Sequence, residues 1–409
     1  MKNELCFKHG LTENGIPIYV MEMPWLKSIA SGVRVCAGTA DEVWPEEAGL
    51  AHGLEHMVFH GGGKFNNSCD LAGDIENIGG ELNAWTWKDH TFYYNNVPCQ
   101  YFERSVDNLS QLVYHANIPE HKIVSEMNNI TQEINKYHDT PVLYAHELAT
   151  ELAYNGTVLA KQTIGTKEAV SNFCRNDFIR FRDRFYIPDN LSFFVVGGIT
   201  LPEAIKTFDQ FFSHNCSGSF NSRYINGIKP MPPSIKEHRK DIDQTNIYLV
   251  YRTLSEDSRY INMYAAMLDS GMSFPLFQDV REKMGLCYSI NASTQKFQNY
   301  GSFMVYVGTG KESTNKAIDS ICDVIWKYKN DSVLLDRTKT FLLGSLDLKY
   351  QSAMYILADT VEDLSLSGVP ADYWEKVEDI KSITIDEVEY CVEKYLTQDK
   401  FKTVIIENE

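Results

Sequence analysis

The chain has 409 residues, of which 44% are hydrophobic and 23% charged, the composition of an ordinary globular protein with more than one core. Its 38 basic and 55 acidic residues give a net charge of −17 with no basic cluster, which argues against nucleic acid as a partner. No apolar run approaches the roughly 20 residues of a membrane helix, so membrane insertion is not expected.

The cysteines and the first residues together predict a compartment. Nine cysteines are scattered without a C-x-x-C pair, unlike a disulfide framework. The opening stretch, MKNELCFKHGLTENG, lacks the apolar core of a secretory signal and the character of an organelle presequence. We therefore expect a cytoplasmic protein.

Apolar runs typical of strands alternate with segments of helical period, and this pattern starts twice along the chain. The first block has predicted strands at 18–21, 28–37 and 191–196, and a last helix at 202–212. Residues 216–238 are rich in Ser, Asn, Gly and Pro, and predict a linker. The second block has predicted helices at 257–270 and 273–283, and strands at 246–253, 286–293, 301–308 and 402–406. An α+β or α/β architecture follows, with domains at 1–215 and 239–409.

The segment PEEAGLAHGLEHMVF predicts a helix that begins at Pro45 and ends at the three glycines 61–63. Leu50, Leu54, Met57 and Val58 would form its apolar stripe. His52 and His56 are four residues apart, so both imidazoles project from one face and can bind one Zn²⁺. Glu55 would overhang the same face, where a carboxylate can take a proton from metal-bound water. The alternative is a helix whose histidines are hydrogen-bonded or exposed.

A second predicted helix, at 121–138, has Ile123, Met127, Ile130 and Ile134 along its apolar side. Glu126 and Glu133 are seven residues apart, hence on one face two turns apart. Two His and one Glu are an established ligand set for a catalytic zinc, so Glu133 could complete the site. Glu126 could orient a ligand histidine. For either glutamate taken alone, a solvated helix face is the more common role. His60 is set aside as a ligand because it falls where the helix ends.

These residues resemble the pitrilysin, insulysin and mitochondrial processing peptidase family of zinc endopeptidases, which share the H-x-x-E-H pattern. In that family a glutamate ligand follows at the distance seen here, where 76 residues separate His56 from Glu133, and another glutamate stands seven residues earlier. The resemblance implies that His52, His56 and Glu133 bind Zn²⁺, that Glu55 is the general base and that Glu126 supports the ligands. It also implies an α+β fold of two similar domains, each a mainly antiparallel sheet packed with helices, which together form one half of a clamshell peptidase.

Two further segments resemble substrate-binding parts of the family. Residues 74–94 are similar to the stretch in which an edge strand, here Asn83, Ala84, Trp85 and Thr86, pairs with the substrate backbone. Residues 276–290 resemble the substrate-positioning motif, which implies that Arg281 and Tyr288 hold a bound peptide.

The resemblance predicts a zinc-dependent endopeptidase that acts on short or unfolded peptides. Because the chain has the length of one half, a homodimer or a heterodimer with a related half is expected. Two alternatives stay open: a subunit of a heterodimeric protease that processes leader peptides or presequences, and a non-catalytic assembly subunit of the same fold.

Overall fold

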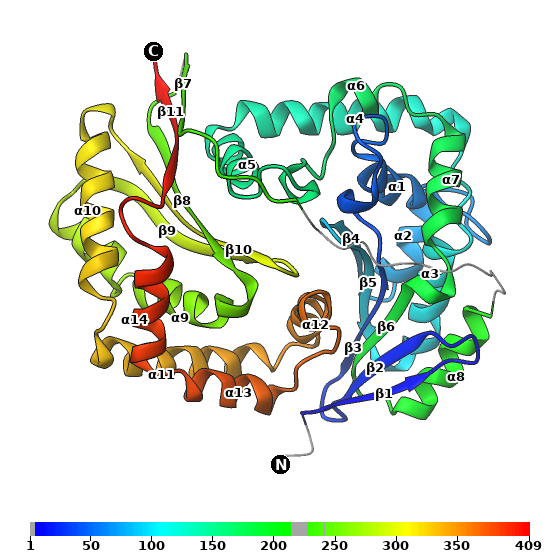
Figure 1. The fold of residues 1–409 in the computed structure, drawn as a ribbon. Coiled ribbons are helices and arrows are strands. Elements are labelled where there is room, and N and C mark those ends of the chain that lie inside the picture. The colour runs from blue at the N-terminus through cyan, green and yellow to red at the C-terminus, as the bar shows by residue number, and fades with distance from the viewer. Residues whose placement is uncertain (1–4, 214–226, 241) are drawn as a thin grey trace. The chain divides into compact units, whose positions relative to one another are not determined.

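The computed structural model describes residues 5–213, 227–240 and 242–409, without the side chains of 365–367. They form two compact units (Figure 1). Unit 1 takes in the described residues of 1–135, 161–224 and 349–375, and unit 2 those of 136–160, 225–348 and 376–409. Each unit is therefore made of separate stretches of the chain, and no single boundary divides the two units. Of the expected linker at 216–238, residues 216–226 lie outside the described part, and 235–238 belong to a strand.

Unit 1 contains a six-stranded sheet in the order β1-β2-β6-β3-β5-β4. In chain order its strands are β1 (Phe7–Leu11), β2 (Pro17–Glu22), β3 (Ser28–Val35), β4 (Glu81–Thr86), β5 (Thr91–Pro98) and β6 (Leu191–Gly197). Only β2 and β6 pair in parallel; the other neighbours are antiparallel. Strand β4 ends the sheet, so one of its edges is left open among the described strands.

Unit 2 contains a five-stranded sheet in the order β7-β11-β8-β10-β9. Its strands are β7 (Ile235–Arg239), β8 (Thr245–Leu254), β9 (Cys287–Lys296), β10 (Tyr300–Thr309) and β11 (Lys402–Asn408). Again one pair, β7 with β11, is parallel and the others are antiparallel. The order β2-β6-β3-β5-β4 of the first sheet thus recurs in the second, strand for strand. The expected α+β fold of two similar, mainly antiparallel domains is confirmed.

Helices cover both sheets. Those of unit 1 include α1 (Leu50–Val58), α2 (Ser68–Glu76), α3 (Phe102–Val113), α6 (Lys167–Val170), α7 (Arg175–Phe185), α8 (Leu201–Phe211) and α12 (Ala353–Ser367). Helix α4 (Glu120–Asp139) belongs to unit 1 as far as residue 135, and its last residues belong to unit 2. Helix α3 packs on β3 and β5, and α1 packs on β4 and β5. Helix α12 contacts β3 and β6 from the other side of this sheet, which is why residues 349–375 cluster with unit 1 (Figure 1).

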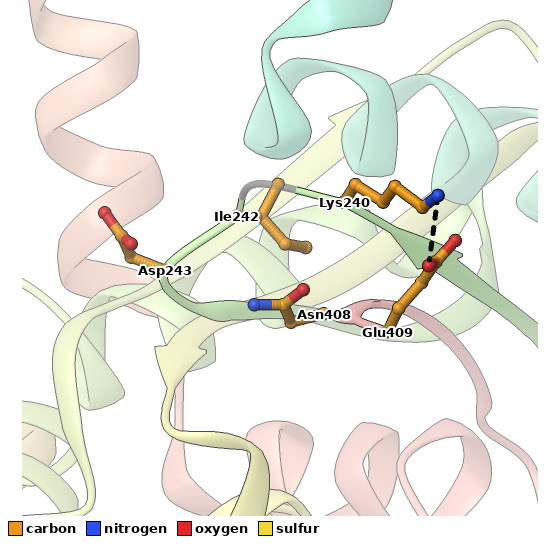
Figure 2. Close-up of a pocket in the computed structure, with 5 residues that line it drawn as sticks. All are labelled: Lys240, Ile242, Asp243, Asn408 and Glu409. Atoms are coloured by element: carbon orange, nitrogen blue, oxygen red, sulfur yellow. Dashed lines mark ion pairs between the residues drawn. The ribbon is translucent and has the colours of Figure 1, made fainter.

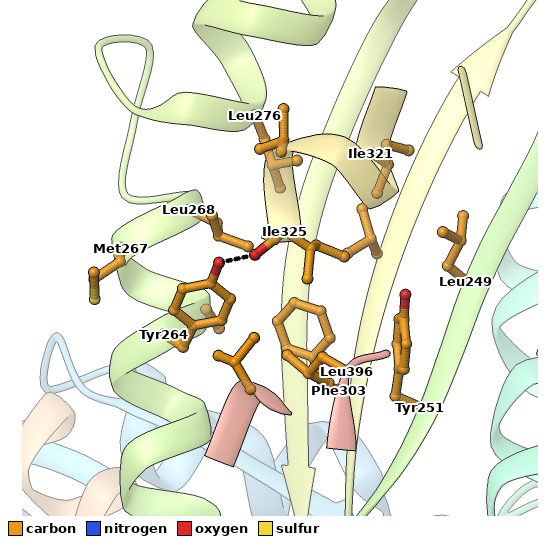
Figure 3. Packing of buried hydrophobic residues seen from close by; sticks show 14 of the residues in the cluster. Leu249, Tyr251, Tyr264, Met267, Leu268, Leu276, Phe303, Ile321, Ile325 and Leu396 are labelled. Atoms are coloured by element: carbon orange, nitrogen blue, oxygen red, sulfur yellow. Dashed lines mark hydrogen bonds between the residues drawn. The ribbon is translucent and has the colours of Figure 1, made fainter. Parts of the chain in front are cut away.

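In unit 2 both faces of the sheet are buried. Its elements include α5 (Pro141–Ala153), α9 (Ser258–Leu268), a π-helix (Leu276–Lys283), α10 (Thr314–Lys327), α11 (Ser332–Lys349) and α14 (Ile385–Tyr395), with α13 (Tyr373–Ser382) at the border of the two units. Along β8, Ile247, Leu249 and Tyr251 enter one core and Tyr248 and Val250 the other, because successive side chains of a strand point to opposite faces. Figure 3 shows Leu249 and Tyr251 in the first of these cores. Helix α5 packs on β8 and β11 over the second core, so 136–160 cluster with unit 2.

No helix among the described residues is both long enough and apolar enough to cross a membrane.

Candidate metal centre

Helix α1 carries both histidines of the H-x-x-E-H pattern, but it begins later than expected. The predicted start at Pro45 is wrong: residues 45–49 form turns and the helix runs from Leu50 to Val58. Gly49 precedes it with φ +90°, a conformation that cannot belong to a right-handed helix. The expected apolar stripe, Leu50, Leu54, Met57 and Val58, is buried.

A buried carboxylate caps the first turn of α1. Glu42 is 2% exposed, and its two oxygens accept hydrogen bonds from the backbone N–H groups of Gly49 (3.0 Å) and Ala51 (2.9 Å). Burial raises the pKa of Glu42 to about 8, although both hydrogen bonds act to lower it. Two N–H groups that a helix start leaves without partners are thus satisfied from outside the helix. The cap fixes the backbone immediately before His52.

Three side chains from α1 and α4 converge at one point. The Nε2 atoms of His52 and His56 each lie 3.9 Å from Oε2 of Glu133. Ligand atoms of the three residues all lie within 4.8 Å of one another, and His60 is outside this set. The predicted apolar stripe of α4, Ile123, Met127, Ile130 and Ile134, is buried, and Glu133 projects from the same helix beside it.

The spacing of these atoms fits a metal ion. A separation of 3.9 Å is too long for a hydrogen bond, so the imidazoles and the carboxylate do not bind each other directly. Two ligands at about 2.0–2.2 Å from a tetrahedral zinc lie roughly 3.3–3.6 Å apart, only a few tenths of an ångström closer. Two imidazole nitrogens and one carboxylate oxygen are also an established zinc ligand set.

The two histidines differ in what supports them. Nδ1 of His56 lies 2.9 Å from Oε1 of Glu126, a hydrogen bond that leaves Nε2 free to face Glu133. Nδ1 of His52 is buried and has no hydrogen-bond partner among the described residues. Burial, followed by the neighbouring His56, lowers the pKa of His52 to about 3, so its imidazole is neutral and able to donate a lone pair. The orientation of the His56 ring is therefore supported by a side chain of α4, whereas the His52 ring has no such support at Nδ1.

Glu55 faces the same point and is tied to strand β4. Its Oε2 accepts a hydrogen bond of 2.5 Å from the hydroxyl of Thr86, the last residue of β4. Burial raises the pKa of Glu55, and the Thr86 bond opposes part of that rise. A carboxylate with a raised pKa beside a metal site is suited to proton transfer near neutral pH.

Strand β4 offers an open, rigid edge beside this carboxylate. The N–H of Ala84 donates to Oδ1 of Asn83 at 2.9 Å instead of to a neighbouring strand. The ring of Trp85 packs against Phe92 and Tyr94, with centroids 4.7 and 5.1 Å away. A main-chain donor that is satisfied only locally is available to another extended chain.

The other two expected substrate residues belong to unit 2. Arg281 lies in the π-helix, with its guanidinium carbon 4.5 Å from the ring centroid of Phe277. Tyr288 is on β9, and 73% of it is exposed. Both residues lie in unit 2, and their role in positioning a peptide stays a prediction.

An open hollow of about 510 Å³ lies beyond the ends of β7 and β11 in unit 2 (Figure 2). It is lined by Lys240, Ile242, Asp243, Asn408 and Glu409, and Lys240 pairs with Glu409 at 3.7 Å. Its polar groups include no set of metal ligands. Among the described residues, His52, His56 and Glu133 form the one group of side chains that could hold a metal ion, and all three lie in unit 1.

Sequence reasoning named the three converging residues, Glu55 and Glu126, but missed three contacts around them. These are the cap by Glu42, the bond from Thr86 to Glu55, and a bond of 2.9 Å between Nε2 of His60 and Oε2 of Glu126. No local pattern marks Glu42 as a cap, because it stands seven residues before the N–H it binds. Thr86 was expected only as part of the strand that pairs with the substrate backbone.

Comparison with known proteins identifies a family. The family model "Insulinase (Peptidase family M16)" matches residues 22–167, and "Peptidase M16 inactive domain" matches residues 172–342. The chain is 27% identical over 401 residues to the uncharacterized zinc protease YmxG of Bacillus subtilis, covering 96% of each chain. It is 25% identical to an uncharacterized zinc protease of Rickettsia bellii, covering 93% of each.

Solved structures share the fold. A protease from Helicobacter pylori superposes with a TM-score of 0.89 at 17% identity, covering 98% of this chain and 99% of that one. The periplasmic protease PqqL of Escherichia coli has a TM-score of 0.79 at 18% identity, and the match spans 98% of this chain but 48% of PqqL. With both domain models matched in sequence order and relatives aligned over nearly their whole length, the chain belongs to the M16 (insulinase) family of peptidases.

Proposed function

We propose that this chain is a zinc-dependent endopeptidase that cleaves short or unfolded peptides. The observation that carries the proposal is the convergence of His52, His56 and Glu133 beside a partly buried Glu55 that is hydrogen-bonded to the open edge strand. His52, His56 and Glu133 would hold the metal. Zinc bound there would supply a water of lowered pKa and an electrophile for the scissile carbonyl.

The residues of the chain divide the remaining work. Glu55 accepts a proton from the attacking water and returns it to the leaving amine, and its raised pKa suits both directions of transfer. Glu126 keeps His56 in the tautomer that presents Nε2. The substrate lies along β4 as an added strand, where Asn83, Ala84, Trp85 and Thr86 bind its backbone whatever its side chains. Arg281 and Tyr288 position the peptide from the second domain.

The decisive experiment is digestion of a mixed peptide library, read by mass spectrometry. The native protein loaded with zinc is compared with Glu55→Gln and with Glu46→Gln, a control that changes an exposed glutamate outside the site. We expect the native protein and the control to cleave, and Glu55→Gln to bind zinc without turnover. Equal cleavage by all three would contradict a base role for Glu55.

We further propose that two such halves form the working enzyme. In support, the chain matches about half of PqqL, and a single metal-type cluster is found in its described residues. Because one chain carries both the zinc cluster and Arg281 and Tyr288, a homodimer would be self-sufficient. Light scattering on the purified protein, alone and under digestion conditions, tests this: an active monomer would refute it, and an inactive one would indicate a heterodimer with a related half.

A further inference from the structure

The carboxylate of Glu126 is held at both of its oxygens. Oε1 lies 2.9 Å from Nδ1 of His56, and Oε2 lies 2.9 Å from Nε2 of His60. The side-chain amide of Asn129 adds a longer bond of 3.3 Å to Oε2.

The contacts of Glu126 with its two histidines differ in length from those of Glu133 in the proposed metal cluster. Around Glu133 the nitrogen to oxygen separations are 3.9 Å, which leaves room for an ion between them. Around Glu126 they are 2.9 Å, the length of a direct hydrogen bond. His60 therefore does not build a second metal site with Glu126. It hydrogen-bonds to the same carboxylate that is hydrogen-bonded to His56.

We propose that His60 is a positioning residue for the zinc site, acting on His56 through Glu126; this rests on the proposed function. A glutamate bonded at one oxygen can still rotate about its last side-chain bond. A second bond at the other oxygen fixes the carboxylate plane and hence the direction of Oε1. The side chains of Glu126 and His60 are 12% and 15% exposed, so water has little access to replace the bond.

The geometry also explains why this residue follows the helix. His60 stands in the turn after Val58, where α1 has ended, four residues beyond His56. From there its ring reaches Oε2 of Glu126 while His56 occupies Oε1, because α4 places Glu126 between them. Glu133 thus faces His52 and His56 at the proposed metal position, and Glu126 hydrogen-bonds to His56 and His60.

The test measures zinc affinity by competition with a chromophoric chelator, independent of catalysis. Variants are His60→Ala, His60→Gln, whose amide can still donate to Glu126, and His121→Ala, a control on an exposed histidine of α4. Partners that bond directly to a metal ligand are typically worth 10–100-fold in affinity, and for one step further out we expect roughly 3- to 10-fold weaker binding. His60→Gln should recover most of the loss, and His121→Ala should equal the native protein. His60→Leu replaces His60→Ala if the latter fails to fold.

A double-mutant cycle with Glu126→Ala decides whether His60 acts through Glu126. If it does, His60→Ala causes no further loss once Glu126 is gone. Additive losses, or native affinity in His60→Ala or His60→Leu, would overturn the inference while leaving the proposed function intact. Absence of zinc binding by the native protein would overturn both.

Discussion

The hydroxyl of Thr86 lies 2.5 Å from Oε2 of Glu55, which joins the end of an open edge strand to the proposed general base. The two residues are 31 positions apart, on β4 and α1. A substrate added along β4 would therefore lie next to the carboxylate that must act on the attacking water. One hydrogen bond thus connects the proposed substrate strand to the proposed general base.

Removal of that bond should impair proton transfer more than substrate binding. In Thr86→Val the side chain keeps its shape but loses the donor, and a hydrogen bond to a charged group is worth roughly 1.5–3 kcal/mol. We expect kcat to fall on the order of tenfold or more, with a smaller change in KM. Since the Thr86 bond lowers the pKa of Glu55, its loss raises that pKa, and the acid limb of the kcat/KM profile should move to higher pH. Thr86→Ser is the control, and an unshifted limb in the valine variant would exclude this role.

The cap by Glu42 should govern both stability and metal binding. Glu42→Leu leaves the N–H groups of Gly49 and Ala51 buried without acceptors, a loss of roughly 2–4 kcal/mol. Because Nδ1 of His52 has no partner of its own, a loosened α1 should also weaken zinc binding. Glu42→Gln keeps one acceptor and should fall between. Thermal unfolding and chelator competition measure the two effects; a leucine variant as stable as Glu46→Gln would show that the cap contributes nothing.

Acid should weaken unit 2 through Asp279. Its carboxylate accepts hydrogen bonds from Lys283 (2.6 Å), Lys327 (3.0 Å) and Tyr328 (2.8 Å). Burial acts to raise its pKa, but these three bonds together outweigh it and lower the pKa to about 2. A folded-state pKa below the unfolded value means that the stabilisation is present above about pH 4 and is lost as the pH falls toward 2.

Asp279→Asn should therefore cost about 2 kcal/mol at pH 7 and progressively less below pH 4. Denaturant unfolding from pH 7 to pH 3 measures the difference from the native protein. Asp319→Asn, which alters an exposed residue of α10, serves as the control. A deficit that stayed constant across this range would contradict the assigned pKa.

Withdrawal of the metal should abolish cleavage and leave the fold in place. Helices α1 and α4 are each anchored by a buried apolar stripe, so their packing does not depend on an ion. We expect the circular dichroism spectrum to stay unchanged on chelation. The melting temperature should drop only by the amount that corresponds to the free energy of zinc binding at the concentration used. Added zinc should restore activity. Global unfolding on chelation would show that the site is structural.

Much of the fold was predictable because burial leaves a periodic trace. Both faces of β8 and β10 are covered, and their continuous apolar runs identified them. Strands β1 and β7 escaped notice because FKHGL and IKEHR are short, polar edge segments. The helix start at Pro45 was wrong since a local pattern cannot reveal that Gly49 is left-handed or that the capping carboxylate comes from Glu42.

The candidate site was predictable where its chemistry is written in spacing. His52 and His56 lie one helical turn apart, and Glu126 and Glu133 two turns apart, so each pair shares a face. The meeting of those two faces is a tertiary event: zinc ligand chemistry suggested that Glu133 could complete the site, and the family resemblance then assigned it. The hydrogen bonds from Thr86 and His60 depend on where these side chains point at the ends of β4 and α1. No periodic sequence pattern predicts such directions.

The strand order repeated in the two sheets separates scaffold from chemistry. Helix α9 stands between β8 and β9 as α1 stands between β3 and β4, yet its sequence, SRYINMYAAML, holds no histidine and it packs as plain core. The frame thus accepts this helix with or without metal ligands. It follows that the strand order alone does not specify a metal centre, because the candidate site needs the two histidines of α1 together with Glu133 of α4.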